Sequence, residues 1–444
     1  MTTYWCELAW LGGERAEPGV SIEVEEGRIA AVEAGVDVAP PGARPLEGLT
    51  IPGLANAHSH AFQRALRGRT QHGTGSFWTW REQMYRLAER IDPDSYLALA
   101  RATYAEMALA GVTTVGEFHY LHHPPGGGRY DDPNEMGRVL MAAAAEAGVR
   151  ITLLDACYLH GGIGEGPEGA QLRFSDGGVD KWAERVDELG EAEDSARVGA
   201  AVHSMRAVDP EAAAVVARWA RERERPLHAH VSEQPAENAA CLEAYGRTPT
   251  ALLADGGALE ASFTAVHATH LDDADVALLG GAGACCCVCP TTERDLADGI
   301  GAMRRLVDAG ASLSLGSDSH ALIDLFEEAR AVELDERLAS GERGRHDSAA
   351  LLRAASADGH ASLGWPDAGR IEPGGRADLV TVSLESVRLA GTAPENALDS
   401  VVFAATATDV RHVLVDGNEV VVDGTHRGID AVSALDETVR KVWA

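Results

Sequence analysis

The stretch LTIPGLANAHSH, Leu49–His60, decides the fold of this chain. Its apolar part, Leu49–His58, predicts a buried strand that ends on histidines. Seven more apolar runs follow along the chain, at Thr113–Phe118, Arg150–Cys157, Val198–His203, Pro226–Val231, Phe263–His267, Gly283–Cys289 and Ser312–Ser317. Amphipathic segments that predict helices lie between most of them, at Tyr96–Leu109, Met136–Ala147, Val179–Leu189, Pro210–Arg223 and Met303–Ala309.

Eight strand–helix repeats predict an α/β fold, a (β/α)8 barrel of the TIM type over residues 51–371. Such a barrel takes about 250 residues, which leaves room for a small second domain in a chain of 444. The count of repeats alone also fits a doubly wound open sheet. The barrel is the sharper expectation, because it requires functional groups at the C-terminal ends of the strands.

Both ends of the chain have the composition of short strands and turns. Strands are predicted at Thr3–Leu8, Val20–Glu25, Arg28–Ala34, Ala377–Ser383 and Val401–Ala404, and a hairpin at His412–Val415 and Val420–Val422. Asp416-Gly417 between the hairpin strands is a strong turn signal. We therefore expect residues 1–50 and 372–430 to form one small discontinuous β domain.

Composition excludes several classes of protein. With 45% hydrophobic and 24% charged residues the chain is an ordinary globular protein. The 38 basic against 69 acidic residues give a net charge of −31, which disfavours binding to nucleic acid or to an anionic membrane surface. The start of the sequence lacks the pattern of a secretory signal, and no window reaches the ~18 apolar residues of a membrane span. We expect a cytoplasmic protein.

Four of the seven cysteines crowd into Cys285–Cys289. Neighbouring cysteines on a strand point to opposite faces, and no second CxxC supplies further ligands. Reduced thiols are therefore expected there, not a zinc or iron–sulfur site.

Metal-ligating residue types stand where predicted strands end. His58 and His60 are two apart and so share a face of an extended segment, and His228 and His230 repeat the spacing. His267 and Asp318 close two later runs. Neutral imidazoles with one carboxylate suit one catalytic divalent ion such as zinc, although iron(II) or manganese fits the same ligands.

Other chemistries have weaker support. The surroundings of Ser232 and Ser319 lack the GxSxG pattern of a serine nucleophile. Gly126-Gly127-Gly128 follows two prolines and is typical of a flexible loop, not of a phosphate site. His122, His123 and His320 have no partner at useful spacing, so we expect them to be loop residues.

A resemblance to a known family rests on motifs spread over the chain. Pro52-Gly53, Asn56-Ala57-His58-Ser59-His60, His228-Ala229-His230 with Glu233, His267, Ser317-Asp318 and Gly375–Val380 resemble the amidohydrolase superfamily. Within it, His58–Ala65, Ser76–Arg81, Glu117–Tyr120, Val266–His270 and Cys289–Glu293 resemble the formimidoylglutamate deiminase family. That family hydrolyses N-formimino-L-glutamate to N-formyl-L-glutamate and ammonia in histidine catabolism.

The resemblance implies a role for each site residue. The metal ligands would be His58, His60, His230 and Asp318, and the catalytic residues His267, Glu233 and Asp318; His228 would not be a ligand. Gln63 would contact the formimino group, and Arg81, Tyr120, His203 and Arg206 would hold the glutamate carboxylates. Proteins of this kind are commonly homodimers.

The expected mechanism is attack of a metal-bound hydroxide on the amidine carbon. Asp318 or His267 would accept the water proton, and Glu233 would carry a proton to the departing ammonia. Two alternatives remain at this point. A deaminase of a purine-like heterocycle would use the same metal with aromatic stacking in place of carboxylate anchors, and a catalytically inactive barrel would bind a ligand for regulation.

Overall fold

The computed structural model describes residues 1–191, 194–260 and 262–444. Its larger sheet has eight strands that are parallel and adjacent in chain order. These are β5 (Leu54–Ser59), β6 (Val112–His119), β7 (Arg150–Cys157), β8 (Ala196–Val202), β9 (Leu227–Val231), β10 (Phe263–His267), β11 (Cys285–Val288) and β12 (Ser312–Leu315). A bridge between Ser59 and Asp318 joins the last strand to the first. The sheet is thus a nearly closed barrel, which confirms the predicted fold and excludes the open sheet.

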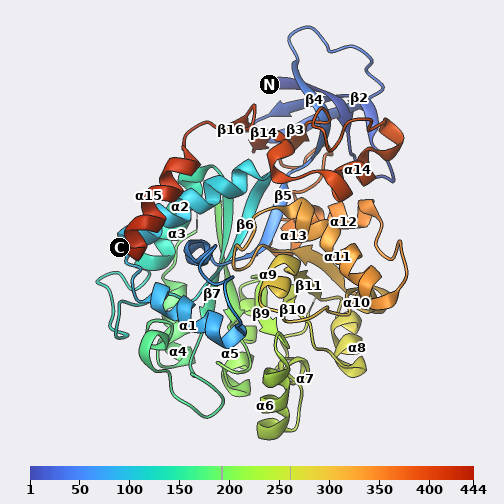
Figure 1. Cartoon of the computed structure of the whole chain (residues 1–444). Coiled ribbons are helices and arrows are strands. Elements are labelled where there is room, and N and C mark those ends of the chain that lie inside the picture. Colours follow the sequence, from blue (N-terminus) through green and yellow to red (C-terminus); the bar gives the residue numbers. More distant parts are fainter. Residues whose placement is uncertain (192–193, 261) are drawn as a thin grey trace.

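Helices surround this barrel (Figure 1). They are α1 (Phe77–Ala88), α2 (Pro93–Leu109), α3 (Glu135–Ala147), α4 (Val179–Asp187), α5 (Pro210–Glu222), α6 (Pro235–Tyr245), α7 (Pro249–Asp255), α8 (Asp273–Gly281), α9 (Pro290–Asp295), α10 (Met303–Ala309), α11 (Leu325–Ser340), α12 (Ser348–Ala355), α13 (Ala357–Ser362), α14 (Ala397–Ala404) and α15 (Ala431–Trp443). Short 3-10 turns are η1 (Ala61–Leu66), η2 (Gly169–Arg173), η3 (Pro394–Asn396) and η4 (Ala407–Asp409).

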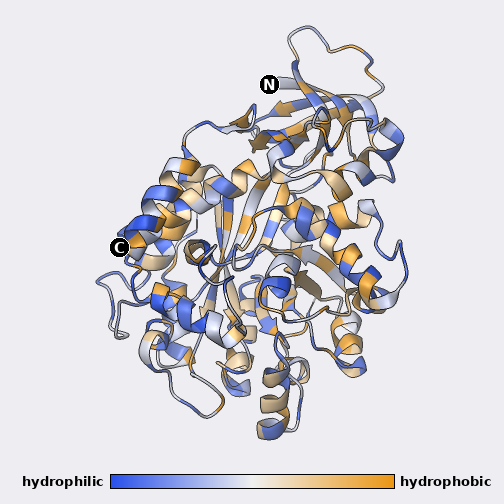
Figure 2. Cartoon of the chain, viewed as in Figure 1, coloured by the Kyte–Doolittle hydropathy of each residue, from blue (hydrophilic) through white to orange (hydrophobic). Residues whose placement is uncertain are grey.

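Helix starts follow from local sequence. Asp92 and Asp209 accept hydrogen bonds from backbone N–H groups of the first turns of α2 and α5, and a proline follows each cap. Hydrophilic and hydrophobic residues alternate around the surface helix α15, as Figure 2 shows. No helix among the described residues is long and apolar enough to cross a membrane.

The two ends of the chain meet in a second sheet of order β16-β15-β14-β13-β4-β1-β2-β3. Its strands are β1 (Thr2–Ala9), β2 (Glu17–Glu25), β3 (Arg28–Ala34), β4 (Arg44–Pro52), β13 (Leu379–Val382), β14 (Val410–Val415), β15 (Asn418–Val422) and β16 (Thr425–His426). β4 pairs antiparallel with β13, which joins the N-terminal to the C-terminal half. Asp416 and Gly417 adopt φ of 47° and 73°, the left-handed values that a tight hairpin turn requires. The separate domain made from both ends, shown at the top of Figure 1, confirms the expectation.

Two predicted strands were wrong. Leu49–His58 is not one strand, because the chain leaves the small sheet at Pro52 and enters the barrel at Leu54. Gly53 forms the junction, where a Cβ atom would lie 2.4 Å from Oγ1 of Thr113. Val401–Ala404 belongs to helix α14, since an apolar run this short does not distinguish a buried strand from a buried helix.

Candidate metal and catalytic site

The predicted ligands converge at the C-terminal ends of the barrel strands. Nε2 of His58 lies 3.1 Å from Nε2 of His230, although β5 and β9 are far apart in sequence. Oδ1 of Asp318 lies 3.4 Å from Nε2 of His58 and 3.3 Å from Nε2 of His60. The strand pleat turns alternate side chains toward the barrel interior and so gathers the four predicted ligands into one cluster, in which the ligand atoms of His58, His60 and Asp318 lie within 4.8 Å of one another.

Two histidines of the cluster hydrogen-bond to the backbone through Nδ1, so that Nε2 is the nitrogen turned toward the cluster. Nδ1 of His60 donates to the carbonyl oxygen of Phe118 at 2.9 Å, and Nδ1 of His230 donates to that of His203 at 2.7 Å. A carbonyl only accepts, so in each neutral ring Nε2 carries the lone pair. Burial lowers the pKa of His58 and His230, and that of His60 to about 3, which keeps these rings neutral. The donor set fits a divalent metal such as zinc.

Two acid–base groups, His267 and Glu233, adjoin this cluster. Nε2 of His267 lies 3.8 Å from Oδ2 of Asp318 and 3.9 Å from Oε1 of Glu233. Burial raises the pKa of Glu233 above its ordinary value. Burial alone would lower the pKa of His267, but its hydrogen bond to Glu293 and the charges of Glu233 and Asp318 raise it to about 10. The pocket thus holds groups that can accept and return protons beside the metal-type cluster.

His228 lies apart from this group. Its Nε2 donates to the carbonyl oxygen of Ser362 at 3.0 Å, at the end of α13. It belongs to none of the groups of potential metal ligands that the described residues form.

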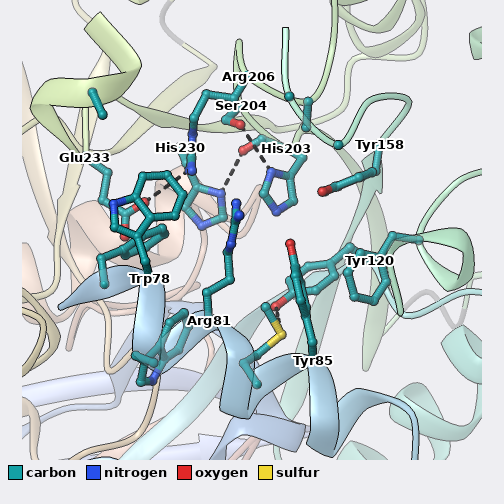
Figure 3. A pocket seen from close by; sticks show the side chains of 18 of the residues that line it. Trp78, Arg81, Tyr85, Tyr120, Tyr158, His203, Ser204, Arg206, His230 and Glu233 are labelled. Carbon is teal, nitrogen blue, oxygen red and sulfur yellow. Dashed lines mark hydrogen bonds and ion pairs between the residues drawn. The ribbon is translucent and has the colours of Figure 1, made fainter. Parts of the chain in front are cut away.

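One cavity of about 280 Å³ opens above the cluster. All five residues expected to bind substrate line it: Gln63, Arg81, Tyr120, His203 and Arg206. Figure 3 shows Arg81 and Arg206 at its wall, with the hydroxyl groups of Tyr85 and Tyr158 also directed inward.

The two arginines differ in their contacts. An Nη atom of Arg206 lies 3.4 Å from Oε2 of Glu233, and its buried Nε has no hydrogen-bond partner among the residues that the structure describes. The guanidinium carbon of Arg81 lies 4.5 Å from the ring centre of Trp78 and 5.5 Å from that of Tyr85. Nε2 of Gln63 donates to the Tyr120 hydroxyl at 2.9 Å. Each arginine keeps donors available toward the cavity.

Comparison with known proteins gives the family. The sequence model described as "Amidohydrolase family" matches residues 49–420. The chain belongs to the amidohydrolase family. A formimidoylglutamate deiminase from Pseudomonas aeruginosa is 37% identical over 399 residues, 87% of this chain and 88% of the relative. The resemblance inferred from the motifs is thereby confirmed.

Two further relatives define the range of similarity. A 5-methylthioadenosine/S-adenosylhomocysteine deaminase from Natronomonas pharaonis is 29% identical over 88% of this chain and 86% of its own length. The crystal structure of an amidohydrolase from Brucella melitensis superposes with a TM-score of 0.92 at 32% identity and covers 100% of both chains. The protein is therefore a hydrolase of the deaminase type within the amidohydrolase family.

The sequence alone did not predict that Glu293 and Cys289 lie in this amidohydrolase site. Oε1 of Glu293 lies 3.4 Å from Nδ1 of His267 and accepts the backbone N–H of Cys289 at 3.0 Å. Sγ of Cys289 shares a cluster with ligand atoms of His267 and Asp318, all within 4.8 Å of one another. The Cys289–Glu293 motif is part of the family resemblance, but only the fold shows that both residues lie next to His267.

His122, His123 and His320 are loop residues, as expected, but each of them has a partner in the fold. They lie outside helices and strands, yet all are buried. Nε2 of His122 donates to the carbonyl oxygen of Ala156 at 2.9 Å, and Nε2 of His123 lies 3.1 Å from Oδ1 of Asp176. His320 bonds to Ser59 and Ser317 beside the metal-type cluster. Apart from Ser317, these partners lie 34 to 261 residues away, so local spacing gives no signal for them.

Proposed function

We propose that the chain hydrolyses N-formimino-L-glutamate to N-formyl-L-glutamate and ammonia. The observation that carries the proposal is one cavity with the His/Asp cluster at its base and Arg81 and Arg206 in its wall. Arginine binds a carboxylate through two parallel hydrogen bonds. A substrate with two carboxylates near a hydrolysable C=N bond matches this distribution of groups, and the 37% identical relative bears that activity in its name.

The two arginines are suited to an anionic substrate in an acidic protein. Arg81 has no ion-pair partner among residues 1–191, 194–260 and 262–444, although the chain carries a net charge of −31. Aromatic rings hold its guanidinium in place and leave its donors for a ligand. Arg206 is paired with Glu233 in the free protein, so a substrate carboxylate would compete for it. His203 and Tyr120 would add further donors to the carboxylates.

His58, His60, His230 and Asp318 would hold the metal, which we propose to be zinc. When bound, a divalent ion of this kind lowers the pKa of a water molecule and so supplies a nucleophile near neutral pH. The buried, neutral imidazoles described above are the donors such an ion needs.

The chain's own residues would orient the substrate and move its protons. Oδ2 of Asp318 would accept the proton of the attacking water. Nε2 of His267, 3.8 Å from it, would instead donate a hydrogen bond, because a pKa of about 10 keeps this imidazole protonated near neutral pH. Glu233 would accept a hydrogen bond from the amidine and pass a proton to the nitrogen that leaves as ammonia. Its raised pKa suits that task, because the carboxyl then binds and releases a proton closer to neutrality. Gln63 would fix the formimino group.

A second candidate is deamination of a ring amidine such as a purine-like base. Phe77, Trp78, Trp80 and Tyr85 line the cavity and offer surfaces on which a heterocycle could stack. The relative from Natronomonas pharaonis is named as a deaminase of purine nucleoside derivatives. Both candidates use the same metal-type cluster, so only the substrate distinguishes them.

The test is ammonia release by zinc-loaded protein from N-formimino-L-glutamate, N-formimino-L-aspartate, guanine and 5-methylthioadenosine. We expect rapid turnover of the glutamate compound, little of the others, and loss of turnover in His230→Ala. Turnover of a purine compound alone would establish the second candidate. No turnover of the glutamate compound with zinc shown to be bound would refute the proposal.

A further inference from the structure

The barrel closes between β12 and β5 by fewer backbone contacts than anywhere else. Each of the other seven neighbouring strand pairs forms a ladder of at least three residue pairs. At the seam, the bridge between Ser59 and Asp318 is isolated. It consists of the His60 N–H donating to the Asp318 carbonyl at 3.2 Å and the Asp318 N–H donating to the His58 carbonyl at 3.0 Å. Three of the four predicted metal ligands stand at this seam: His58 on β5, His60 directly after β5, and Asp318 beyond β12.

A buried chain of side chains joins the two sides of the seam. His320 lies at its centre, with Nδ1 2.9 Å from the Ser317 hydroxyl and Nε2 3.2 Å from the Ser59 hydroxyl. The Ser59 hydroxyl donates to Glu117 at 2.6 Å. Nδ2 of Asn56 donates to the Ser317 hydroxyl at 2.7 Å. We call these five residues the seam network.

The seam network alternates in sequence with the ligands. Ser59 lies between His58 and His60, and Ser317 directly precedes Asp318. Successive side chains of a strand point to opposite faces, so Ser59 projects away from the cluster that its neighbours form. Fixing Ser59 and Ser317 therefore fixes the backbone from which three ligands project.

Further contacts make the network rigid. The second carboxylate oxygen of Glu117 accepts the backbone N–H of Ala61 at 2.7 Å, just beyond His60. Oδ1 of Asn56 accepts the Ser317 N–H at 2.9 Å, and Nε of Arg67 donates to the His320 carbonyl at 2.8 Å. Asp318 and His320 have φ of 43° and 58°, so this turn is held in a left-handed conformation that non-glycine residues rarely adopt. All five residues of the network are buried.

We propose that His320, Ser59 and Glu117 are positioning residues that hold His58, His60 and Asp318 at the spacing a bound metal needs. None of the three contacts the cavity, so they act only through the ligands. Partners of this kind typically change metal affinity by about 10–100-fold when they are lost.

The experiment measures zinc release and needs no substrate, so it stands or falls separately from the proposed function. Zinc-loaded wild type, Ser59→Ala, His320→Gln and Ser356→Ala are mixed with excess chelator, and the rate of zinc loss is followed. Ser356 is the matched control, because its buried hydroxyl donates to the Leu352 carbonyl outside the network. We expect release about 10–100-fold faster in Ser59→Ala and His320→Gln, and within about twofold of wild type in Ser356→Ala.

A thermal scan with and without zinc separates positioning from general destabilisation. The upward shift of the midpoint that zinc causes should shrink in Ser59→Ala and His320→Gln and persist in Ser356→Ala. If His320→Gln does not fold, Ser59→Ala, which removes one oxygen atom, carries the test alone. Wild-type release rates in a folded Ser59→Ala, or equal acceleration in Ser356→Ala, would overturn the proposal. Members of one network couple, so strictly additive effects of Ser59→Ala and His320→Gln on the rate of zinc release, measured in the double variant, would also overturn the proposal.

Discussion

Arg81 and Arg206 are the residues that separate an acidic substrate from a heterocycle. We expect Arg81→Met and Arg206→Met each to raise KM for N-formimino-L-glutamate by about 10–100-fold, because a hydrogen bond to a charged group contributes about 1.5–3 kcal/mol. Arg86→Met is the matched control, since Arg86 is an exposed arginine on the same helix as Arg81. Steady-state kinetics on the three variants checks the expectation, and unchanged KM in both cavity variants would contradict it.

The raised pKa of His267 depends in part on Glu293, a residue outside the predicted site set. This pKa is raised to about 10 with Glu293 as a main cause, so Glu293→Gln should lower it toward the ordinary histidine value. The pKa should fall because a neutral amide stabilises the positively charged imidazolium less than a carboxylate does. An NMR titration of the metal-free protein measures the shift, with His267→Asn identifying the signal. A pKa that stays the same or rises in Glu293→Gln would show that the charge of Glu293 is not the cause.

Local spacing predicted only part of the proposed ligand set, and the choice of His230 over His228 came from the family resemblance. His58 and His60 are two apart at the end of an apolar run, and strand geometry alone puts both on one face. The site contacts of Glu293 and His320 were not predicted, since Glu293 meets His267, and His320 meets Ser59, only after the strands have formed a barrel. Their contacts to His267 and Ser59 cross 26 and 261 residues of sequence.

At the scale of elements, the junction between β4 and β5 depends on a single glycine. A Cβ on Gly53 would lie 2.4 Å from Oγ1 of Thr113 and 2.8 Å from Cβ of Asp378. We expect Gly53→Ala to destabilise the chain by about 1–3 kcal/mol, the usual cost of overpacking, and to lower the thermal midpoint. Gly13→Ala is the control, because a Cβ there meets nothing within 4 Å. Equal midpoints for the two variants would contradict this account.

The same junction shows which features of a strand an apolar pattern cannot predict. β3, β7 and β10 match their predicted bounds, since each is one apolar segment between turn signals. Leu49–His58 is equally continuous in hydrophobicity, yet Pro52 pairs with Leu379 and Leu54 with Val112, in different sheets. An apolar run indicates that its residues are buried, but it does not show which sheet they join. The apolar pattern therefore could not predict the break at Gly53.

The molecule as a whole carries a large excess of negative charge, with 69 acidic against 38 basic residues. Its 31 excess negative charges on 16807 Å² of accessible surface amount to one per roughly 540 Å², a mean spacing of about 23 Å. That spacing is shorter than the screening length of about 30 Å at 0.01 M salt and longer than the length of about 8 Å at 0.15 M. Mutual repulsion of the excess charges is therefore felt at low salt and screened at moderate salt.

Because the mean charge spacing lies between the two screening lengths, the stability of the protein should depend on salt concentration. Self-repulsion opposes the compact state, so we expect the thermal midpoint to rise between 0.01 M and 0.15 M NaCl. Screening also weakens the surface ion pairs, such as Arg44–Glu419 and Arg427–Glu419, but exposed pairs contribute only about 0–1 kcal/mol each. Scans at a fixed heating rate, with sucrose of equal osmolality in place of the added salt, isolate the effect of screening. A midpoint that falls with NaCl would mean that the ion pairs outweigh the repulsion among the 31 excess charges.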